Sequence, residues 1–320
     1  MGKIIDGEAV ARQVKETLQS EVQELSSAGI SPTLAAILAT ENRGAHIYAK
    51  SQARSCAEVG IEYQLIEISP TSNQKFLADT VERLNQDPAV HGIIVQLPLP
   101  EGVHTRVLQG QIAPSKDVEG VSAANQGGIV YAAQPFFKKP AIGEQGHEEW
   151  LERSLTWPLP MPAPCTAIGM MRLIRSVGKD LYGMEAVVVG HSEIVGKPMA
   201  LLLMAHFCTT TVCHIATQDL ASHTRKADIL VVAVGKPGLI TANMVKPGAI
   251  VIDAGINRIK VQDKEGRTKT RVTGDVDFDT VREVAGFITP VPGGVGPMTT
   301  AILLANTVKS AQASVRGGKG

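Results

Sequence analysis

The sequence predicts an α/β protein of two domains with parallel sheets. Its 320 residues are enough for two domains that each bury their own hydrophobic core. Short apolar runs rich in β-branched residues alternate with longer segments whose apolar residues recur at helical spacing. This alternation predicts parallel strands with helices on both faces of each sheet. Because such sheets gather functional groups at the carboxyl ends of their strands, we expect binding residues in the loops that follow the strands.

The first part of the chain shows this alternation clearly. The predicted helices are 6–28, 44–59 and 73–85, and the predicted strands are 34–39, 63–68 and 90–95. In the first helix Val10, Val14 and Leu18 recur at helical spacing, and Gly29 supplies the stop. The last of these strands leads into the loop 96–100, which we expect at a carboxyl edge.

The second part repeats the pattern. The predicted helices are 166–177, 199–207, 278–284 and 299–308, and the predicted strands are 186–189, 211–214, 229–233 and 249–253. Between the two parts, residues 131–164 hold five prolines from position 140 onward and predict a long irregular excursion. The tail from Ser314 is expected to be disordered.

The composition is that of an ordinary globular protein. Lys+Arg and Asp+Glu both number 31, so the formal net charge is zero and favours neither a nucleic acid nor a membrane surface as partner. The N-terminus has no long apolar segment and no run could span a bilayer, so we expect a cytoplasmic protein. The four cysteines lack C-x-x-C spacing, which favours buried free thiols, and no metal site is expected.

Residues 186–198 carry the main sign of a ligand. A buried strand, 186–189, ends at Gly190, and Ser192 can accept hydrogen bonds from N–H groups at the start of the next helix. Gly196 allows that helix to approach the strand closely. The unpaired N–H groups and the positive helix end can hold a phosphate. The same residues also suit a plain strand–helix connection, because the full G-x-G-x-x-G pattern is absent.

Six stretches of the chain together resemble a known family. They are Gly-Ile-Ile-Val-Gln-Leu-Pro-Leu-Pro (92–100), Lys-Asp-Val-Glu-Gly (116–120), Pro-Cys-Thr (164–166), Val-Gly-His-Ser-Glu-Ile-Val-Gly-Lys-Pro (189–198), Lys-Pro-Gly-Ala-Ile-Val-Ile-Asp (246–253) and Ile-Thr-Pro-Val-Pro-Gly-Gly-Val-Gly-Pro-Met-Thr (288–299). In this order they resemble methylenetetrahydrofolate dehydrogenase/cyclohydrolase, a family of bifunctional folate enzymes. The resemblance runs from about residue 3 to about residue 310.

The resemblance implies a domain organisation and an activity. A folate-binding α/β domain is expected at 1–159, which includes the excursion 131–159 and is joined by a C-terminal helix at 296–320. A Rossmann-like NAD(P)-binding domain is expected at 160–295, with the active site in the cleft between the domains. The family oxidises 5,10-methylenetetrahydrofolate with a nicotinamide cofactor. It then hydrolyses the methenyl product to 10-formyltetrahydrofolate, a step of one-carbon metabolism that feeds purine biosynthesis.

The family motifs also imply site residues. Tyr48 matches a tyrosine that packs on the folate ring system, Gln96 matches a glutamine that orients the catalytic lysine, and Asp117 matches an aspartate that holds the pterin. Glu119 stands where the family commonly has a second aspartate; on the sequence alone both acids of this turn also suit a solvated loop. The expected substrate-binding residues are Tyr48, Gln96, Leu97, Asp117, Pro292, Gly293 and Gly294.

Gln52 is the main departure from the family. The family pattern is Tyr-x-x-x-Lys, with both side chains on one helical face, but this chain has Gln52 four residues after Tyr48. Hydride transfer needs mainly positioning. Hydrolysis needs proton transfer, which an amide cannot perform. We therefore count Tyr48, Gln52, Gln96 and Asp117 as the catalytic set and predict a dehydrogenase with weak or absent cyclohydrolase activity.

Two alternatives stay open. One is a bifunctional enzyme in which Lys50, Arg54 or a water replaces the lysine; the other is a folate- or nucleotide-binding protein without turnover. Binding without hydride transfer would select the second. The resemblance implies that the substrate is a tetrahydrofolate derivative. It also implies a homodimer, because members of the family usually dimerise through the NAD(P)-binding domain.

The cofactor residues follow from the same resemblance. They are Gly190, His191, Ser192, Ile194, Val195, Ile215, Val234, Gly235, Ile256 and Thr299. The family turn Gly-Arg-Ser is here Gly190-His191-Ser192, and residues 214–217 offer neither the serine nor the basic residue that often binds the 2′-phosphate of NADP. Either NAD or NADP is compatible with this site, and these changes favour NAD.

Overall fold

The computed structural model describes residues 1–132, 162–262 and 268–317, so most of the expected excursion 131–164 lies outside the described residues. The described chain divides into two compact units. The six-stranded unit comprises residues 1–11, 129–132, 166–262 and 268–299, and the three-stranded unit comprises 12–128, 162–165 and 300–317.

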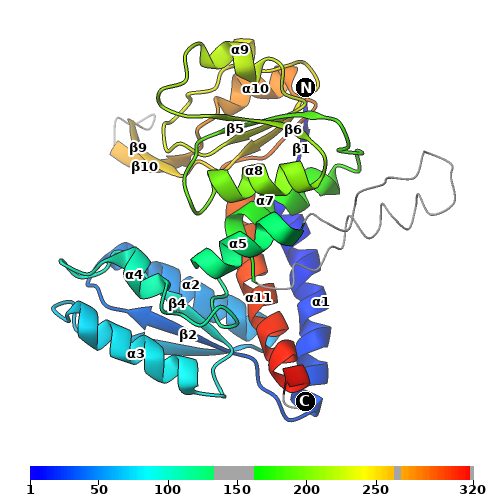
Figure 1. Cartoon of the computed structure of the whole chain (residues 1–320). Coiled ribbons are helices and arrows are strands. Elements are labelled where there is room, and N and C mark those ends of the chain that lie inside the picture. Colours follow the sequence, from blue (N-terminus) through cyan, green and yellow to red (C-terminus); the bar gives the residue numbers. More distant parts are fainter. Residues whose placement is uncertain (133–161, 263–267, 318–320) are drawn as a thin grey trace, which may run out of the picture. The chain divides into compact units, whose positions relative to one another are not determined.

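The six-stranded unit is built on a parallel sheet with the strand order β1-β11-β8-β7-β5-β6 (Figure 1). Its strands are β1 (Lys3–Ile4), β5 (Glu185–Val189), β6 (Thr209–Cys213), β7 (Ile229–Val232), β8 (Ile250–Asp253) and β11 (Phe287–Ile288). Every residue of β7 and β8 is buried, as expected for apolar strands covered on both faces. The parallel sheet confirms the predicted fold class.

Helices cover both faces of this sheet. They are α7 (Cys165–Ser176), α8 (Gly196–Ala205), α9 (Leu220–Thr224), the 3₁₀ helix η2 (Ala242–Met244) and α10 (Phe278–Val284). Val187 and Val189 pack on one face with Val281 of α10. Figure 1 shows α8 on the opposite face of the sheet from α9 and α10.

The three-stranded unit has a parallel sheet with the order β3-β2-β4. Its strands are β2 (Thr33–Leu38), β3 (Glu62–Glu67) and β4 (Gly92–Val95). The other helices within the described residues are α1 (Gly7–Ser27), α2 (Arg43–Val59), α3 (Gln74–Gln86), α4 (Thr105–Gln109), α5 (Ala123–Ala132) and α11 (Val295–Gly317). Leu77 and Leu84 of α3 and Leu108 of α4 form one core cluster with β2 and β4.

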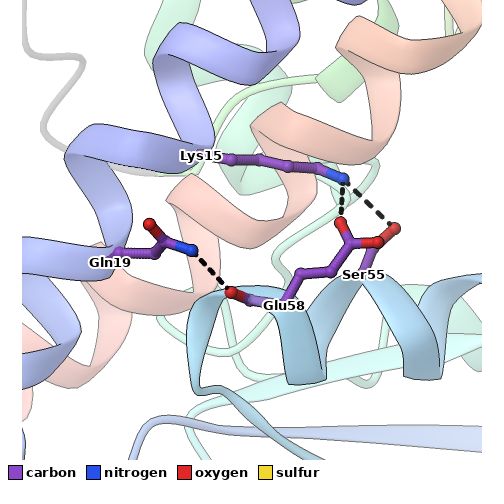
Figure 2. A network of polar contacts seen from close by, with 4 residues as sticks. All are labelled: Lys15, Gln19, Ser55 and Glu58. Atoms are coloured by element: carbon purple, nitrogen blue, oxygen red, sulfur yellow. Dashed lines mark hydrogen bonds and ion pairs between the residues drawn. The ribbon is translucent and has the colours of Figure 1, made fainter.

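Polar contacts fasten α2 to α1 within the three-stranded unit. Nζ of Lys15 donates to Oε2 of Glu58 at 2.6 Å and to Oγ of Ser55 at 3.5 Å, and Figure 2 shows these contacts as dashed lines. Gln19 donates to the backbone oxygen of Glu58 at 2.8 Å. These contacts hold the C-terminal half of α2, the helix that carries Tyr48 and Gln52.

The structure differs from the sequence-based expectations in several places, among them the short elements α4, α9 and β11, which were not predicted. The short strand β1 and the antiparallel hairpin β9–β10 (Asn257–Gln262 and Thr268–Thr273) have no strong apolar pattern and were not predicted. The helix expected to continue from the glycine turn through 199–207 ends at Ala205, because Phe207 adopts a φ of 60°. The tail expected to be disordered from Ser314 is helical to Gly317, since Gln312 donates to Glu21 of α1 and Ala311 is buried.

Candidate active site

The helix α2 presents the first site residues of the three-stranded unit. It starts where Oδ1 of Asn42 accepts hydrogen bonds from the backbone N–H groups of Gly44 and Ala45, and it ends at Gly60 in the left-handed region, with φ 84°. Between these ends, Tyr48 and Gln52 lie one helical turn apart and therefore share a face.

Gln52 is buried at 2% exposure and is the centre of a hydrogen-bond group. Its Oε1 accepts from Nε2 of Gln96, which follows β4, at 2.6 Å and from the hydroxyl of Tyr63 on β3 at 3.4 Å. Lys50 and Arg54 on the same helix are exposed, so neither takes the place of the buried side chain. The sequence brought Gln52 and Gln96 to one site, but it gave no role to Tyr63.

Tyr48 and Glu119 lie together beside this group. Burial raises the pKa of the Tyr48 hydroxyl, the charge of Glu119 raises it further, and a hydrogen bond with Gln52 lowers it, although 46% of the residue remains exposed. Burial, and secondly the charge of Asp117, raise the pKa of Glu119 to about 7. A half-buried carboxyl group that titrates near neutral pH can both accept and donate a proton.

Asp117 has a different environment from Glu119. It is 1% exposed, and its Oδ1 accepts from the backbone N–H groups of Gly120 and Val121 at 3.1 and 3.3 Å. Its Oδ2 accepts from the N–H of Ser122 at 2.7 Å and from Nδ2 of Asn125 at 3.0 Å. These four donors fill the acceptor positions of the carboxylate, which therefore fixes the turn that leads into α5.

Asn306 of α11 holds the same turn from the other side. Its Nδ2 donates to the backbone oxygens of Val118 and Ala163 at 2.8 and 3.1 Å. This places Glu119 between two fixed neighbours. The sequence carried no signal for Asn306, because it sits in an apolar helix far from the turn.

The other expected substrate residues lie in loops of separate units. Leu97 follows Gln96 and is 51% exposed. Pro292, Gly293 and Gly294 lie in the six-stranded unit between β11 and α11, with Pro292 exposed and Gly294 buried. Gly293 has a φ of 103° that favours glycine, and a Cβ on Gly294 would lie 2.6 Å from the backbone oxygen of Pro290.

The expected cofactor residues gather at one edge of the six-stranded sheet. Gly190, Ile215, Val234 and Ile256 follow β5, β6, β7 and β8, and these neighbouring parallel strands end at the same edge. Of the other members, His191, Ser192, Ile194 and Val195 continue from Gly190, and Gly235 follows Val234. Thr299 lies instead on α11, where its hydroxyl lies 3.3 Å from that of Thr166.

The turn between β5 and α8 is built for close approach. Gly190 has a φ of 116°, and a Cβ on it would lie 2.2 Å from the backbone oxygen of Ala233. A Cβ on Gly196 would lie 2.0 Å from the backbone oxygen of Gly190. Oγ of Ser192 accepts from the N–H of Gly196 at 3.3 Å, as predicted. The exposed side chains of Ile194 and Ile215 offer apolar surface nearby, so the edge fits a dinucleotide with a phosphate at the turn and flat rings on the apolar residues.

Comparison with known proteins identifies the family. The catalytic-domain model of tetrahydrofolate dehydrogenase/cyclohydrolase matches residues 5–119, and the NAD(P)-binding-domain model of the same family matches residues 164–315. The chain belongs to the tetrahydrofolate dehydrogenase/cyclohydrolase family. The three-stranded unit thus contains most of the family's catalytic domain, and the six-stranded unit contains most of its NAD(P)-binding domain.

Relatives and solved structures agree with this membership over nearly the full chain. A "Bifunctional protein FolD" of Nitratiruptor sp. is 44% identical over 97% of this chain and 98% of that protein, and one of Variovorax paradoxus is 41% identical over 98% and 99%. The solved FolD dehydrogenase/cyclohydrolase of Campylobacter jejuni has a TM-score of 0.84 and 39% identity, covering 98% of this chain and 99% of that one. The Trypanosoma brucei enzyme, solved with NADP and an inhibitor, has a TM-score of 0.84 and 34% identity, with the same coverage.

Two further observations concern metal ions and membranes. Among the described residues, no group of three or more His, Cys, Asp or Glu side chains could hold a metal ion. In the same parts of the chain, no helix is both long enough and apolar enough to cross a membrane.

Proposed function

We propose that this protein oxidises 5,10-methylenetetrahydrofolate to 5,10-methenyltetrahydrofolate by hydride transfer to a nicotinamide cofactor. The observation that carries the proposal is the buried pair Gln52–Gln96 with Tyr48 and Glu119 beside it, in the part of the chain that matches the family's catalytic domain. Tyr48 offers an aromatic face to the folate. The cofactor supplies the hydride acceptor, and Gly190, Ser192 and the exposed apolar residues of the sheet edge would hold it.

Within this proposal the protein carboxylate that binds the pterin of the substrate is that of Glu119 rather than that of Asp117. The four hydrogen bonds to Asp117 come from the protein itself, which leaves no acceptor position for the pterin. Glu119 is half-buried and has the longer side chain. It can accept hydrogen bonds from pterin N–H groups when ionised and can exchange a proton near neutral pH.

The second candidate function is the bifunctional one. The names of the relatives, which are 41–44% identical over nearly the whole chain, favour it over the loss of cyclohydrolase activity expected from Gln52. In a bifunctional enzyme with Gln52, another group must exchange the proton during hydrolysis. Glu119 suits that role by its position beside Tyr48, whereas Lys50 and Arg54 are exposed.

One set of assays separates these functions. Purified protein is mixed with 5,10-methylenetetrahydrofolate and either NAD or NADP, and the reduced cofactor and the methenyl product are recorded together. In a second arm, methenyltetrahydrofolate is supplied directly, so that hydrolysis is measured without oxidation. Reduced cofactor with accumulating methenyl product supports a dehydrogenase alone. Enzyme-dependent loss of the methenyl compound supports the bifunctional candidate. Binding of folate and cofactor without reduction would overturn both in favour of a binding protein.

For the cofactor we propose NAD over NADP. The turn after β6 uses its own polar groups internally: the N–H of His214 donates to the Thr217 hydroxyl at 2.8 Å, and the N–H of Ala216 donates to Nδ1 of His214 at 3.2 Å. The ring of His191 lies 5.0 Å from that of His214. His191 stands at the position where the family turn Gly-Arg-Ser would supply a guanidinium group for the 2′-phosphate. Calorimetric dissociation constants for NAD and NADP test this, and tighter binding of NADP would overturn it. The variant His191→Arg should favour NADP by about tenfold relative to the wild type, since a charge-assisted hydrogen bond is gained.

We also propose a homodimer that forms through the edge strand β6. This strand is the last in the sheet, and its Val212 is exposed, as are Tyr182 before β5 and Met204 on α8. Open edges with apolar side chains pair readily with a second strand. Light scattering should give twice the chain mass for the wild type and a smaller mass for Val212→Glu. A monomeric wild type would overturn the proposal.

A further inference from the structure

Two buried aspartates in the six-stranded unit have no part in the site described so far. Asp253 ends β8 and is 3% exposed, and Asp275 follows β10 and is fully buried. A buried carboxylate is costly unless its oxygens accept hydrogen bonds. The hydrogen bonds to this pair come from backbone N–H groups and one asparagine. Some of these donors belong to the loops at the sheet edge where the expected cofactor residues lie.

Asp275 holds the turn that follows β7. Its Oδ2 accepts from the backbone N–H groups of Val234 and Gly235, at 2.7 and 2.9 Å. Its Oδ1 accepts from Nδ2 of Asn257, the first residue of β9, at 2.8 Å. One carboxylate therefore fixes the loops after β7 and β8 relative to each other.

Asp253 in turn holds Asp275. Its Oδ1 accepts from the N–H of Asp275 at 3.0 Å, and its Oδ2 accepts from the N–H of Val276 at 2.9 Å. The N–H of Asp253 donates to the hydroxyl of Thr289 at 2.8 Å. The chain of contacts thus runs from Thr289, in the loop after β11, to the turn after β7.

Glycines make this arrangement sterically specific. A Cβ on Gly274 would lie 1.8 Å from Oδ2 of Asp253, and a Cβ on Gly255 would lie 2.3 Å from Cγ of Asp275. Each carboxylate is therefore packed against a backbone that only glycine permits at that distance. If these two positions served only to fill the core, apolar side chains would do so without the cost of burying two carboxylates.

We propose that Asp275, held by Asp253, is a positioning residue for the nicotinamide end of the cofactor. The N–H groups of Val234 and Gly235 are occupied by the carboxylate, and its negative charge disfavours a phosphate at this turn. The phosphates are thereby left to the turn at Ser192, and the turn after β7 receives the ring, whose oxidised form is cationic. This inference rests on the proposed cofactor site.

The test uses the full chain with Asp275→Asn, and Asp277→Asn is the matched control. Asp277 lies two residues away, and its Oδ2 accepts from the hydroxyl of Thr280 rather than from the amides of the turn after β7. Amide hydrogen exchange is measured without cofactor. Exchange at Val234 and Gly235 should accelerate roughly tenfold in Asp275→Asn and stay unchanged in the control. Unchanged exchange at both amides would overturn the proposal whether or not the cofactor binds.

The second readout is cofactor affinity measured by calorimetry. In Asp275→Asn the dissociation constant of the oxidised cofactor should rise roughly tenfold, and that of the reduced cofactor should rise less, because only the oxidised ring is cationic. An equal rise for both forms would mean that Asp275 only supports the fold and would overturn the positioning role. If Asp275→Asn does not fold, Asn257→Ala removes one of the three contacts, and unchanged exchange in that variant would overturn the linkage of the two loops. A wild type that binds no nicotinamide cofactor at all would instead overturn the proposed function.

Discussion

Nε2 of Gln96 donates a hydrogen bond to Oε1 of Gln52 at 2.6 Å, with both side chains buried. Gln52 stands four residues after Tyr48, where the Tyr-x-x-x-Lys pattern of the sequence analysis leads us to expect a lysine. An amide in this position can orient Tyr48 and accept from Tyr63, but near neutral pH it acts as neither a general acid nor a general base.

We therefore predict that Gln52→Lys raises the rate of methenyltetrahydrofolate hydrolysis by about 100-fold or more, the usual contribution of a general acid or base. Reduction of the cofactor should change much less, because hydride transfer depends on positioning. Absorbance of the methenyl compound measures the first rate, and Gln13→Lys on the exposed face of α1 is the control. Equal hydrolysis by wild type and Gln52→Lys would contradict the prediction.

The two acids of the turn before α5 should respond oppositely to substitution. Asp117→Ala removes the acceptor of the N–H groups of Val121 and Ser122 and one of the acceptors of Gly120 and Asn125, and it should cost about 3 kcal/mol or more of unfolding free energy. Glu119→Gln should not lower stability at pH 7, because the wild type buries a carboxyl group that is partly ionised there, but it should raise KM for the folate substrate. Urea unfolding and initial-rate kinetics measure the two effects. A stable Asp117→Ala variant with a raised KM would reverse the assignment.

Glu119 should also make stability depend on pH. Its pKa is about 7 in the folded protein against 4.5 for the free group, so the folded state binds the proton more tightly. The resulting stabilisation is complete below about pH 4.5 and is lost as the pH rises through 7. Glu119→Gln cannot titrate, so its stability relative to the wild type should increase from pH 4.5 to 7. Thermal melts across this range measure the difference, and Glu101→Gln, at an exposed position, should follow the wild type in parallel.

Gly190 should tolerate no side chain. Both Gly190 and Gly178 have positive φ, but nothing lies within 4 Å of a Cβ at Gly178. Gly178→Ala should therefore cost about 1 kcal/mol, and Gly190→Ala about 2–4 kcal/mol with loss of cofactor binding, because its Cβ meets the backbone of Ala233. Melting temperature and cofactor calorimetry distinguish the two. Normal cofactor affinity in a folded Gly190→Ala variant would remove this turn from the cofactor site.

Much of the fold follows from local patterns. The strands β2, β5, β7 and β8 were predicted to within one or two residues because each is a short apolar run. The hydrogen bond from Gly196 to Ser192 was also predictable, since it closes within four residues. The strands β1, β9 and β10 were not, because a short or polar strand is stabilised by its partner and not by its own sequence.

The sequence by itself determined the alternation of strands and helices, the glycine turn after β5 and the presence of an amide, Gln52, four residues after Tyr48. Only the tertiary structure decided which polar groups are paired. Gln52 meets Gln96 across 44 residues, and Asp275 meets Val234 across 41. It also separated Asp117, whose acceptors are filled, from Glu119, two residues along the same turn. Periodicity reports which side of an element faces the core, whereas the role of a buried polar group depends on partners that the fold brings from distant parts of the chain.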